Sequence, residues 1–470
     1  MPACRSEGTR KPVRRWIVTR DPGRADSDGA AELDKMAASE GEASEQPDQL
    51  AAQPGDDGLD DGLVELVVGK PAAGGGCVAR LPDGRVAFVR HAIPGERVLA
   101  RITEEARSYV RADAVTIGQA APSRVSPPCR HSGPGRCGGC DWQHVSLSMQ
   151  REMKSALVTE HLQRIAGIER AVTVEAVPGD DNGLGWRTRA RYAVLPRGRL
   201  GFHRYRSHDI QPVDRCPIAG PGIARLAPEL LSWKGAEEVE VFAPEAEGEL
   251  TVMIDSRRGA RAQVPRFDGG LVVDGRTIRE PSELLVSSLG HRFVVSAGVF
   301  WQVHAGASAT LGRALIDSAE LRQGERVADL YAGAGLFTAL LADAIGEGGH
   351  VLAVEQDARA AEDAYRNVLG SAHVDVLCAR VTPELVTREL RATDLVVLDP
   401  PRQGAGKQVT AALATLALRR IVYVACDAAS FARDLRVLLD GGWSLSALRA
   451  FDLFPMTEHV ELMAVIDAPS

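Results

Sequence analysis

The sequence contains no apolar run long enough to span a bilayer, and no apolar segment follows the arginines near its start. A membrane-spanning helix needs about 20 mainly apolar residues, and a secretory signal needs a shorter apolar core. These two absences predict a cytoplasmic protein that has no membrane partner.

The sequence also lacks the excess of positive charge that many nucleic-acid-binding proteins carry, because its net charge is −8. The first 61 residues hold eight basic and fourteen acidic side chains, so residues 62–470 are close to neutral. This first segment is rich in Ala, Gly, Asp and Glu and poor in aromatic residues, and such a composition cannot offset the entropy lost on ordering. We therefore predict a disordered tail over residues 1–61, and the net charge does not exclude an RNA partner.

At 470 residues the chain is too long for one hydrophobic core, so several domains are expected. Residues 62–118 read as five short strands separated by Gly- and Pro-containing turns. Five strands in so short a segment predict a small β-barrel of the oligonucleotide-binding type.

Residues 119–295 predict a mixed α+β central domain, with a helix near residues 150–165. Between Trp186 and Arg206, basic residues alternate with neutral ones and aromatic residues lie among them. Side chains two apart share one face of a strand, and basic faces with aromatic residues are typical of RNA contact. The predicted RNA-binding residues are Arg187, Arg189, Arg191 and Arg204. An ordinary solvated sheet face remains the alternative.

Residues 296–470 alternate between strand and helix patterns, which predicts an α/β domain with a doubly wound, Rossmann-like, mostly parallel sheet. The last strand is expected to run antiparallel. In such sheets ligands bind beyond the carboxyl ends of the strands. The polar candidates at predicted strand ends are Gly333, Gly335, Glu355, Asp399 and Cys426.

The glycine turn at Gly333 and Gly335 allows a ligand to approach the backbone closely. The third glycine of the dinucleotide fingerprint is absent, which argues against NAD. S-adenosylmethionine carries no phosphate and needs only this close approach and an acidic ribose anchor, for which Glu355 is placed. An ordinary strand-to-helix turn is the alternative for this feature alone.

Cys426 follows a predicted strand and precedes a predicted helix, so the helix dipole is expected to lower the thiol pKa. A thiolate can add to C6 of a pyrimidine and turn C5 into a nucleophile. Asp399 precedes two prolines, which hold it in an extended, rigid turn toward the same cleft.

Several motifs together resemble those of the RNA uracil-5-methyltransferase family: Asp-Pro-Pro-Arg at 399–402, Tyr-Val-Ala-Cys at 423–426 and Phe-Pro-Met-Thr-Glu-His-Val-Glu at 454–461. The order of strands and turns in residues 62–118 resembles a TRAM domain, which binds RNA. The resemblance implies catalytic roles for Cys426 as nucleophile, Glu461 as base and Asp399 facing the uracil. It also implies S-adenosylmethionine as cofactor, bound by Gln302, Tyr331, Gly333, Gly335, Glu355 and Asp399.

Four cysteines, Cys129, Cys137, Cys140 and Cys216, have a spacing that favours metal or cluster ligation over disulfides. They resemble the ligands of the family's iron–sulfur branch, which implies a [4Fe–4S] cluster. Zinc is the rival, with His131 and His144 as further candidate ligands. The Cys-x3-Cys-x2-Cys run of radical enzymes is absent.

The predicted function is therefore methylation of C5 of a uridine in RNA, with 23S ribosomal RNA favoured as substrate. Transfer RNA is the alternative substrate, and a catalytically silent RNA-binding or RNA-folding protein is the alternative function. An amino-methyltransferase is disfavoured, because Arg402 stands where an aromatic residue would stack on the base. A monomer is favoured, although the sequence leaves the oligomeric state open.

Overall fold

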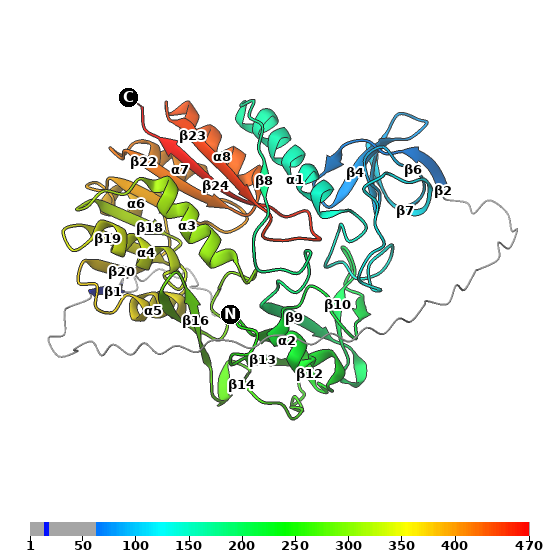
Figure 1. Cartoon of the computed structure of the whole chain (residues 1–470), viewed down its shortest axis with the longest axis horizontal. Coiled ribbons are helices and arrows are strands. Elements are labelled where there is room, and N and C mark those ends of the chain that lie inside the picture. The colour runs from blue at the N-terminus through cyan, green and yellow to red at the C-terminus, as the bar shows by residue number, and fades with distance from the viewer. Residues whose placement is uncertain (1–13, 18–62, 470) are drawn as a thin grey trace, which may run out of the picture.

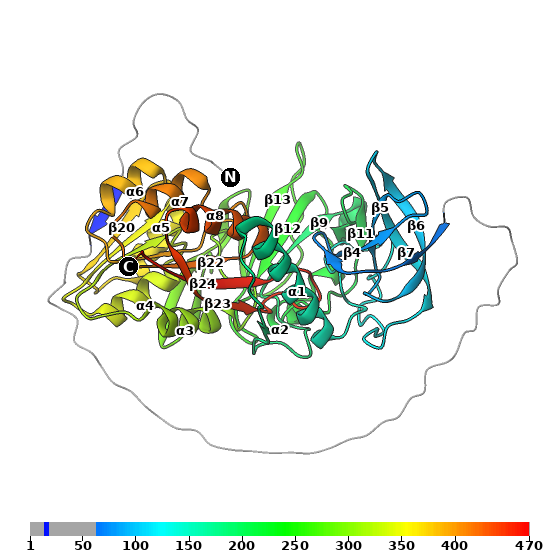
Figure 2. The same cartoon turned by 90° about the horizontal axis from the view of Figure 1, so that it is seen from above.

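The computed structural model describes residues 14–17 and 63–469. It contains a small barrel, a central sheet and a C-terminal domain built on a large sheet (Figure 1). The barrel and the C-terminal domain lie at opposite ends of the molecule, and Figure 2 shows the same order from above.

The barrel is a six-stranded sheet in the order β2-β6-β7-β5-β4-β3. Alternate residues of each strand, such as Ala87 and Val89 of β5, are fully buried and form its core. The strands are β2 (Leu63–Val67), β3 (Pro71–Ala72), β4 (Gly76–Arg80), β5 (Val86–Arg90), β6 (Arg97–Glu105) and β7 (Tyr109–Gln119). The short β3 is an addition to the five predicted strands.

The central sheet has seven strands in the order β11-β10-β9-β12-β13-β14-β15. Strands β9 and β10 form a hairpin, with its turn at residues 196–198. The strands are β9 (Arg189–Val194), β10 (Leu200–His203), β11 (Ile210–Pro212), β12 (Ala236–Phe242), β13 (Thr251–Ser256), β14 (Gly270–Val273) and β15 (Arg276–Arg279), and the helix is α2 (Pro221–Leu226).

The C-terminal domain is built on a nine-stranded sheet in the order β1-β20-β19-β18-β21-β22-β24-β23-β8. Strands β18 to β22 are parallel, and β24 runs antiparallel to β22, as predicted. The strands of residues 326–467 are β18 (Arg326–Leu330), β19 (His350–Glu355), β20 (Val374–Cys378), β21 (Leu395–Leu398), β22 (Arg420–Ala425), β23 (Ser444–Phe451) and β24 (Glu461–Asp467).

Helices cover both faces of this sheet, which explains why its central strands are mainly apolar. One core packs α3, α4 and α5 against one face, and a second core packs α6, α7 and α8 against the other. Figure 2 shows α3 and α4 on the side opposite α6, α7 and α8. The helices are α3 (Ala307–Ala319), α4 (Leu336–Ile345), α5 (Ala358–Asn367), α6 (Pro383–Glu389), α7 (Lys407–Ala414) and α8 (Ala428–Asp440).

Segments from elsewhere in the chain complete the C-terminal domain. Helix α1 (Leu147–His161) and strand β8 (Val174–Glu175) pack on it from the central region, and β8 pairs with β23. The hairpin β16 (Glu283–Ser288) and β17 (His291–Ser296) packs on α5, whose Asp363 accepts a hydrogen bond from Ser296 N at 2.8 Å. Residues 283–296 thus belong to this domain by their packing.

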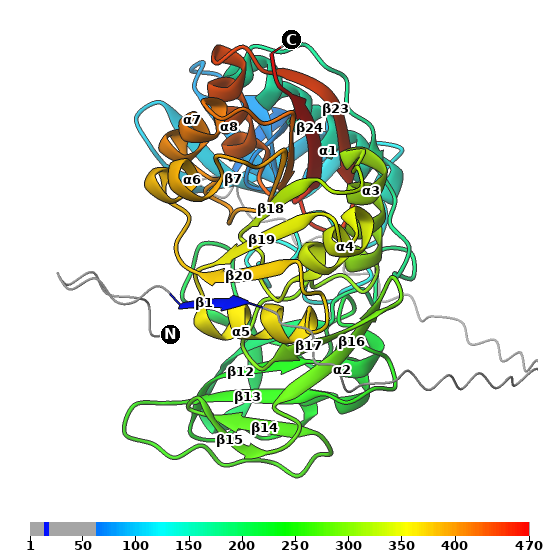
Figure 3. The same cartoon turned by 90° about the vertical axis from the view of Figure 1, so that its left-hand side faces the viewer.

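Strand β1 (Arg14–Ile17) forms the opposite edge of the sheet and runs antiparallel to β20 (Figure 3). These four residues fall in the segment predicted to be a disordered tail, and the prediction is corrected for them. The backbone of β20 offers an unpaired edge, which a short segment of any composition can extend through main-chain hydrogen bonds. The rest of the predicted tail lies outside the described residues.

Within residues 14–17 and 63–469, none of the helices combines the length and apolar character needed to cross a membrane.

Candidate active site

The predicted site residues of the C-terminal domain meet at one edge of its sheet. Tyr331 directly follows β18, Glu355 ends β19, Asp399 follows β21 and Cys426 follows β22. The strand order reverses between β18 and β21, and in doubly wound sheets the ligand site lies at such a switch point. Cys426 and the two carboxylates therefore lie beside the glycine turn.

Strand pairing places Cys426 beside Glu461. Ala425 of β22 pairs with Leu462 of antiparallel β24, so the next position in the register sets Cys426 opposite Glu461. Neighbouring strands lie about 4.8 Å apart. A thiol and a carboxylate thus face the same cleft from two adjacent strand ends.

The glycine turn after β18 is held in place by Glu355. Its carboxylate accepts Gly333 N at 2.9 Å and Asp357 N at 2.7 Å. Each carboxylate oxygen has a second acceptor site, so Glu355 can still receive hydroxyl groups from a ligand. A Cβ on Gly333 would meet no atom within 4 Å, so the space above this glycine is open. Tyr331 has φ of 67°, which turns the chain toward the cleft.

Gln302 lies in the connection between β17 and α3, apart from these strand ends in sequence. This connection is tied to the central region, because Thr188 N donates to Val303 O at 2.8 Å.

The open space above Gly333 and the free acceptor sites of the Glu355 carboxylate fit a nucleoside cofactor without phosphate.

Three carboxyl groups share the buried floor of the cleft. Burial, followed by the charge of Asp329, raises the pKa of Asp399 to about 7. Burial also raises the pKa of Asp329 to about 7, while a hydrogen bond from Thr338 at 2.6 Å opposes the rise. Burial and the charge of Asp399 raise the pKa of Glu461 well above its usual range. Proton binding by these three carboxyl groups is therefore favoured, and a positively charged ligand beside them would favour their ionised forms.

The thiol of Cys426 has a higher pKa than the sequence predicts. Burial, then the charges of Glu461 and Asp399, raise the pKa of Cys426 to about 12, although Arg402 opposes the rise. The prediction of a thiol pKa lowered by the α8 dipole is therefore wrong. A helix terminus contributes typically 0.3–1 kcal/mol, roughly, whereas burial and like charges can shift a pKa by several units.

Asp434 of α8 holds the loop that follows Asp399, a role that the sequence did not reveal. It accepts hydrogen bonds from Tyr423 Oη at 2.7 Å and from the backbone N of Ala405 at 2.8 Å. Ser430 Oγ donates to Arg402 O at 2.8 Å in the same loop. The Ala-Arg-Asp motif at 432–434 thus stabilises the Asp-Pro-Pro-Arg turn.

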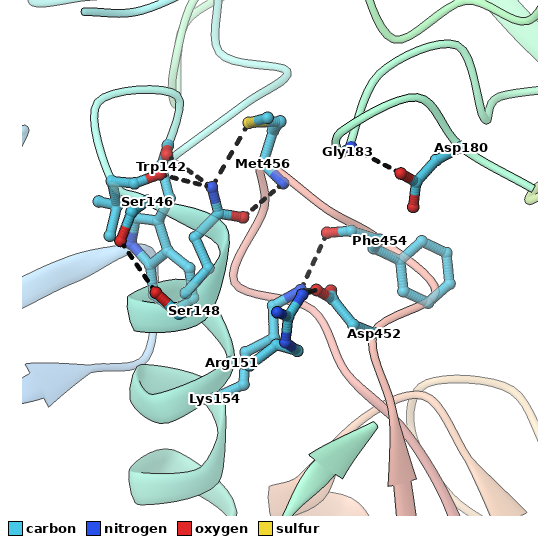
Figure 4. Close-up of polar contacts among 12 residues, drawn as sticks. Trp142, Ser146, Ser148, Arg151, Lys154, Asp180, Gly183, Asp452, Phe454 and Met456 are labelled. Carbon is cyan, nitrogen blue, oxygen red and sulfur yellow. Dashed lines mark hydrogen bonds and ion pairs between the residues drawn. The ribbon is translucent and has the colours of Figure 1, made fainter. Parts of the chain in front are cut away.

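The β23–β24 loop, residues 452–460, leads directly to Glu461 and is fastened to α1 by two buried side chains (Figure 4). Lys154 Nζ donates to Asp452 Oδ1 at 2.5 Å and to Phe454 O at 3.0 Å. Gln150 accepts Met456 N at 2.8 Å. Lys154 and Gln150 are fully buried. Residues some 300 positions apart thus fix this loop, and no local sequence signal indicated these contacts.

The arginines of β9 share one face as predicted, but protein groups occupy them. Arg191 Nη2 lies 2.6 Å from Glu240 Oε2, and Arg189 lies 4.2 Å over the ring of Phe242. Arg187 donates to Arg189 O at 2.8 Å. Arg189, whose side chain is only 13% exposed, is therefore mainly a packing residue, whereas Arg187 and Arg191, the latter with a side chain 53% exposed, stay predicted RNA-binding residues. The alternating glutamates of β12 were the sequence signal for these partners.

Arg204 lies elsewhere, in a basic cleft between the barrel and the central sheet. The cleft has an empty volume of about 1040 Å³. Its wall contains two acidic residues, Glu104 and Asp113, and two aromatic rings, Phe88 and Tyr205. The five basic residues that line this junction cleft are Arg90, Arg111, Arg136, Arg204 and Arg206. Of these five, only Arg204 is a predicted RNA-binding residue. Arg90 and Arg111 belong to the barrel, Arg136 lies next to Cys137, and Arg206 lies in the turn after β10.

The four predicted cysteine ligands line one pocket in the central region, together with His131. His144 does not line this pocket and instead packs 6.0 Å from His91. Burial raises the thiol pKa of Cys140, and it raises the thiol pKa of Cys216 to about 11. The charges of neighbouring thiolates raise both pKa values further. In the part of the chain that the structure describes, no three His, Cys, Asp or Glu side chains are arranged to hold a metal ion.

Comparison with known proteins identifies the family. Residues 64–115 match the TRAM domain, and residues 282–467 match the tRNA (Uracil-5-)-methyltransferase family model. A 23S rRNA (uracil(1939)-C(5))-methyltransferase, RlmD, from Chromohalobacter salexigens is 33% identical, over 87% of this chain and 90% of the relative. The chain belongs to the RNA uracil-5-methyltransferase family.

Further relatives agree with this membership. An uncharacterized RNA methyltransferase from Streptomyces avermitilis is 44% identical, over 86% of this chain and 98% of the relative. The crystal structure of Pyrococcus abyssi tRNA (uracil-54, C5)-methyltransferase with S-adenosyl-L-homocysteine has a TM-score of 0.65 at 24% identity, covering 85% of this chain and 99% of that one. The latter likeness shows the fold. The predicted family, fold class and enzyme class, an S-adenosylmethionine-dependent RNA (uracil-5-)-methyltransferase, are confirmed.

Proposed function

We propose that the protein methylates C5 of a uridine in 23S ribosomal RNA through a covalent bond between Cys426 and C6 of the base. The observation that carries this proposal is the register that sets Cys426 opposite Glu461, at the sheet edge that also holds the glycine turn. This arrangement joins a nucleophile, a proton acceptor and a cofactor site in one cleft.

In the free protein the Cys426 thiol is neutral, because its pKa is about 12. When uracil enters, the thiol proton passes to the Asp399 carboxylate, so that Glu461 stays ionised, and Sγ bonds to C6, which makes C5 a carbon nucleophile. S-adenosylmethionine supplies a methyl group on a positively charged sulfur, and C5 takes this methyl group as the sulfur–methyl bond breaks.

Glu461 completes the reaction as the base. Its carboxylate removes the C5 proton, the C5=C6 double bond forms again, and the Cys426–C6 bond breaks. Because the pKa of Glu461 is raised by burial and by Asp399, positive charge in the cleft favours its ionised form. Asp399 follows β21, on the other side of β22 from Glu461, and contributes to the same balance of charge; we propose that it faces the base.

The choice of 23S ribosomal RNA rests on the RlmD relative, which matches over most of both chains. Transfer RNA is the alternative substrate. The target uridine must leave its stack to reach a cleft at the end of a sheet, so a looped or flipped nucleotide is required. The predicted cytoplasmic location belongs to the same proposal.

We also propose the junction cleft as part of the RNA path. Five arginines face two carboxylates there, so the cleft attracts phosphates, and Tyr205 offers a ring for stacking. Arg204 retains its predicted RNA-binding role in this cleft.

For the cysteine pocket, we propose a [4Fe–4S] cluster held by Cys129, Cys137, Cys140 and Cys216. The support is that all four thiols line one pocket. A zinc ion draws its four sulfurs to about 2.3 Å from one centre, whereas a cluster separates them at four iron corners. Anaerobically purified protein should contain about four irons and four sulfides per chain. One zinc per chain would favour the rival.

The catalytic proposal is tested with RNA that contains 5-fluorouridine. Fluorine at C5 cannot leave as a proton does, so the wild-type protein should form a stable RNA adduct. Cys426→Ala should form no adduct and methylate no RNA. Cys4→Ala, which removes a thiol outside the described residues, is the matched control and should behave as wild type. Methylation by Cys426→Ala would contradict the proposal.

A further inference from the structure

The barrel and the β23–β24 loop meet at a two-glycine turn of the barrel. Gly74 N and Gly75 N both donate to Oε2 of Glu458, at 2.6 and 2.8 Å. Both glycines have positive φ, 93° and 75°. Successive N–H groups in such a turn form a concave anion-binding nest, and here the anion is the Glu458 carboxylate. Glu458 lies three residues before Glu461.

Other groups hold this turn from the side of the central region. Trp142 Nε1 donates to Gly75 O at 3.0 Å, and Tyr205 Oη donates to Gly74 O at 3.1 Å. A Cβ on Gly75 would lie 2.5 Å from Cγ of Asp141. The turn is therefore a close-packed frame that admits only glycine at position 75, and Glu458 docks onto it.

The same turn forms part of the wall of the junction cleft. Ala73, Gly74 and Gly76 line the cleft, and so does Tyr205. The guanidinium of Arg90, also in this wall, lies 3.5 Å from the centre of the Tyr205 ring and 3.3 Å from Asp141 Oδ1. RNA in the cleft would thus touch the frame that holds Glu458.

The β23–β24 loop is anchored along its length. Its base is fastened to α1 through Lys154, as Figure 4 shows, and through Gln150, and its middle is held by Trp142 N, which donates to Met456 O at 3.0 Å. Its far part is fastened to the barrel through Glu458, and Glu461 follows directly at the start of β24. Loss of the Glu458 side-chain contact would leave the α1 contacts and the bonds of Met456 O to Trp142 N and of Glu458 N to Asp141 in place, and would remove the direct tie between the barrel and the residues that precede Glu461.

We propose that Glu458 is a positioning residue that couples the seating of the barrel to the placement of Glu461. The inference rests on the proposed function, in which Glu461 removes the C5 proton after methyl transfer. Loss of the anchor should slow this last proton transfer more than the formation of the Cys426–C6 bond, because Cys426 lies on a different strand. A displacement of about 1 Å can reduce a rate by roughly a hundredfold.

The test uses the full-length protein with ordinary uridine-containing substrate RNA. Glu458→Ala should lower kcat roughly 10- to 100-fold, with RNA and S-adenosylmethionine affinities within about twofold of wild type. A methylated, covalent RNA–protein complex should accumulate, because the C5 proton leaves slowly. It is detected as a denaturation-resistant band that carries the labelled methyl group.

Two further variants distinguish the effect of side-chain length at position 458 from the effect of its charge. Glu458→Gln should restore kcat, because one amide oxygen can accept both N–H groups that now share Oε2. Glu458→Asp keeps the charge but is one methylene shorter, so it should resemble Glu458→Ala. Glu283→Ala is the matched control, because it removes a carboxylate paired with Arg366 on the C-terminal domain, away from the barrel.

The outcomes are distinct. An unchanged kcat in Glu458→Ala, a loss explained by RNA affinity alone, or a Glu458→Gln variant as slow as Glu458→Ala would overturn the inference. If wild-type protein neither methylates RNA nor forms an adduct with 5-fluorouridine RNA, the proposed function itself fails. If Glu458→Ala does not fold, the ratio of rates between Glu458→Gln and Glu458→Asp decides the question.

Discussion

The reactivity of Cys426 toward alkylation should depend on the carboxylates around it. Its pKa is raised from an ordinary value of 9.0 to about 12, so its thiolate fraction at neutral pH falls about a thousandfold. Burial is the main cause, and Glu461 is the nearest charge. Glu461→Gln removes that charge, and one neighbouring charge is worth roughly 1–3 pKa units. Because burial is the largest cause of the shift and remains in this variant, alkylation of Cys426 at pH 8 should become roughly 10-fold faster.

The assay is iodoacetamide labelling between pH 7 and 10, with the Cys426 peptide quantified by mass spectrometry. In wild-type protein the rate should rise about tenfold per pH unit without reaching a plateau. Glu175→Gln is the control, since its carboxylate, on the edge strand β8, pairs with Arg449 and is not among the charges that shift the pKa of Cys426. A wild-type midpoint between pH 8 and 9, or slower labelling in Glu461→Gln, would refute the electrostatic account.

Three other changes probe separate parts of the structure. Lys154→Met leaves the buried Asp452 without its main partner, so the free energy of unfolding in urea should fall by roughly 3–5 kcal/mol, and adding Asp452→Leu should recover part of the loss. Arg204→Ala combined with Arg206→Ala should weaken RNA binding. The slope of log binding constant against log salt concentration should become shallower by roughly 0.7–0.9 for each lost phosphate contact. The affinity for S-adenosylmethionine, measured by calorimetry, should stay unchanged. Glu355→Ala releases Gly333 and should weaken S-adenosylmethionine binding at least tenfold in calorimetry while the RNA affinity stays unchanged.

The sequence predicted the C-terminal domain well because each of its signals is local. Apolar runs mark the strands, the glycine turn marks the first connection, and Asp399 and Cys426 stand directly at strand ends. Parallel strands that are buried on both faces must bring such ends to one edge, so the positions of the candidate site residues followed from topology.

The contacts that hold the site could not be predicted, because they join segments far apart in the chain. Gly74 and Glu458 are separated by 384 positions, and Lys154 and Asp452 by 298. A charged residue in a helix pattern ordinarily faces solvent, so nothing local marks Lys154 as fully buried.

Two interpretations failed because partners were not considered. The period-two pattern of the β9 arginines carries no information about β12, the strand that pairs with β9, whose Glu240 lies opposite Arg191. The thiol pKa was inferred from the helix that follows Cys426, without the carboxylates that the fold brings beside it. In both cases the missing information was the identity of the neighbouring strand.

The most direct test of the central claim is nucleoside mass spectrometry of ribosomal and transfer RNA fractions, from cells with and without the gene. The account predicts that 5-methyluridine disappears from a site in large-subunit ribosomal RNA and returns with the wild-type gene, whereas the Cys426→Ala gene does not restore it. Unchanged 5-methyluridine in ribosomal RNA would contradict the proposed substrate, and unchanged 5-methyluridine in both fractions would contradict the proposed activity.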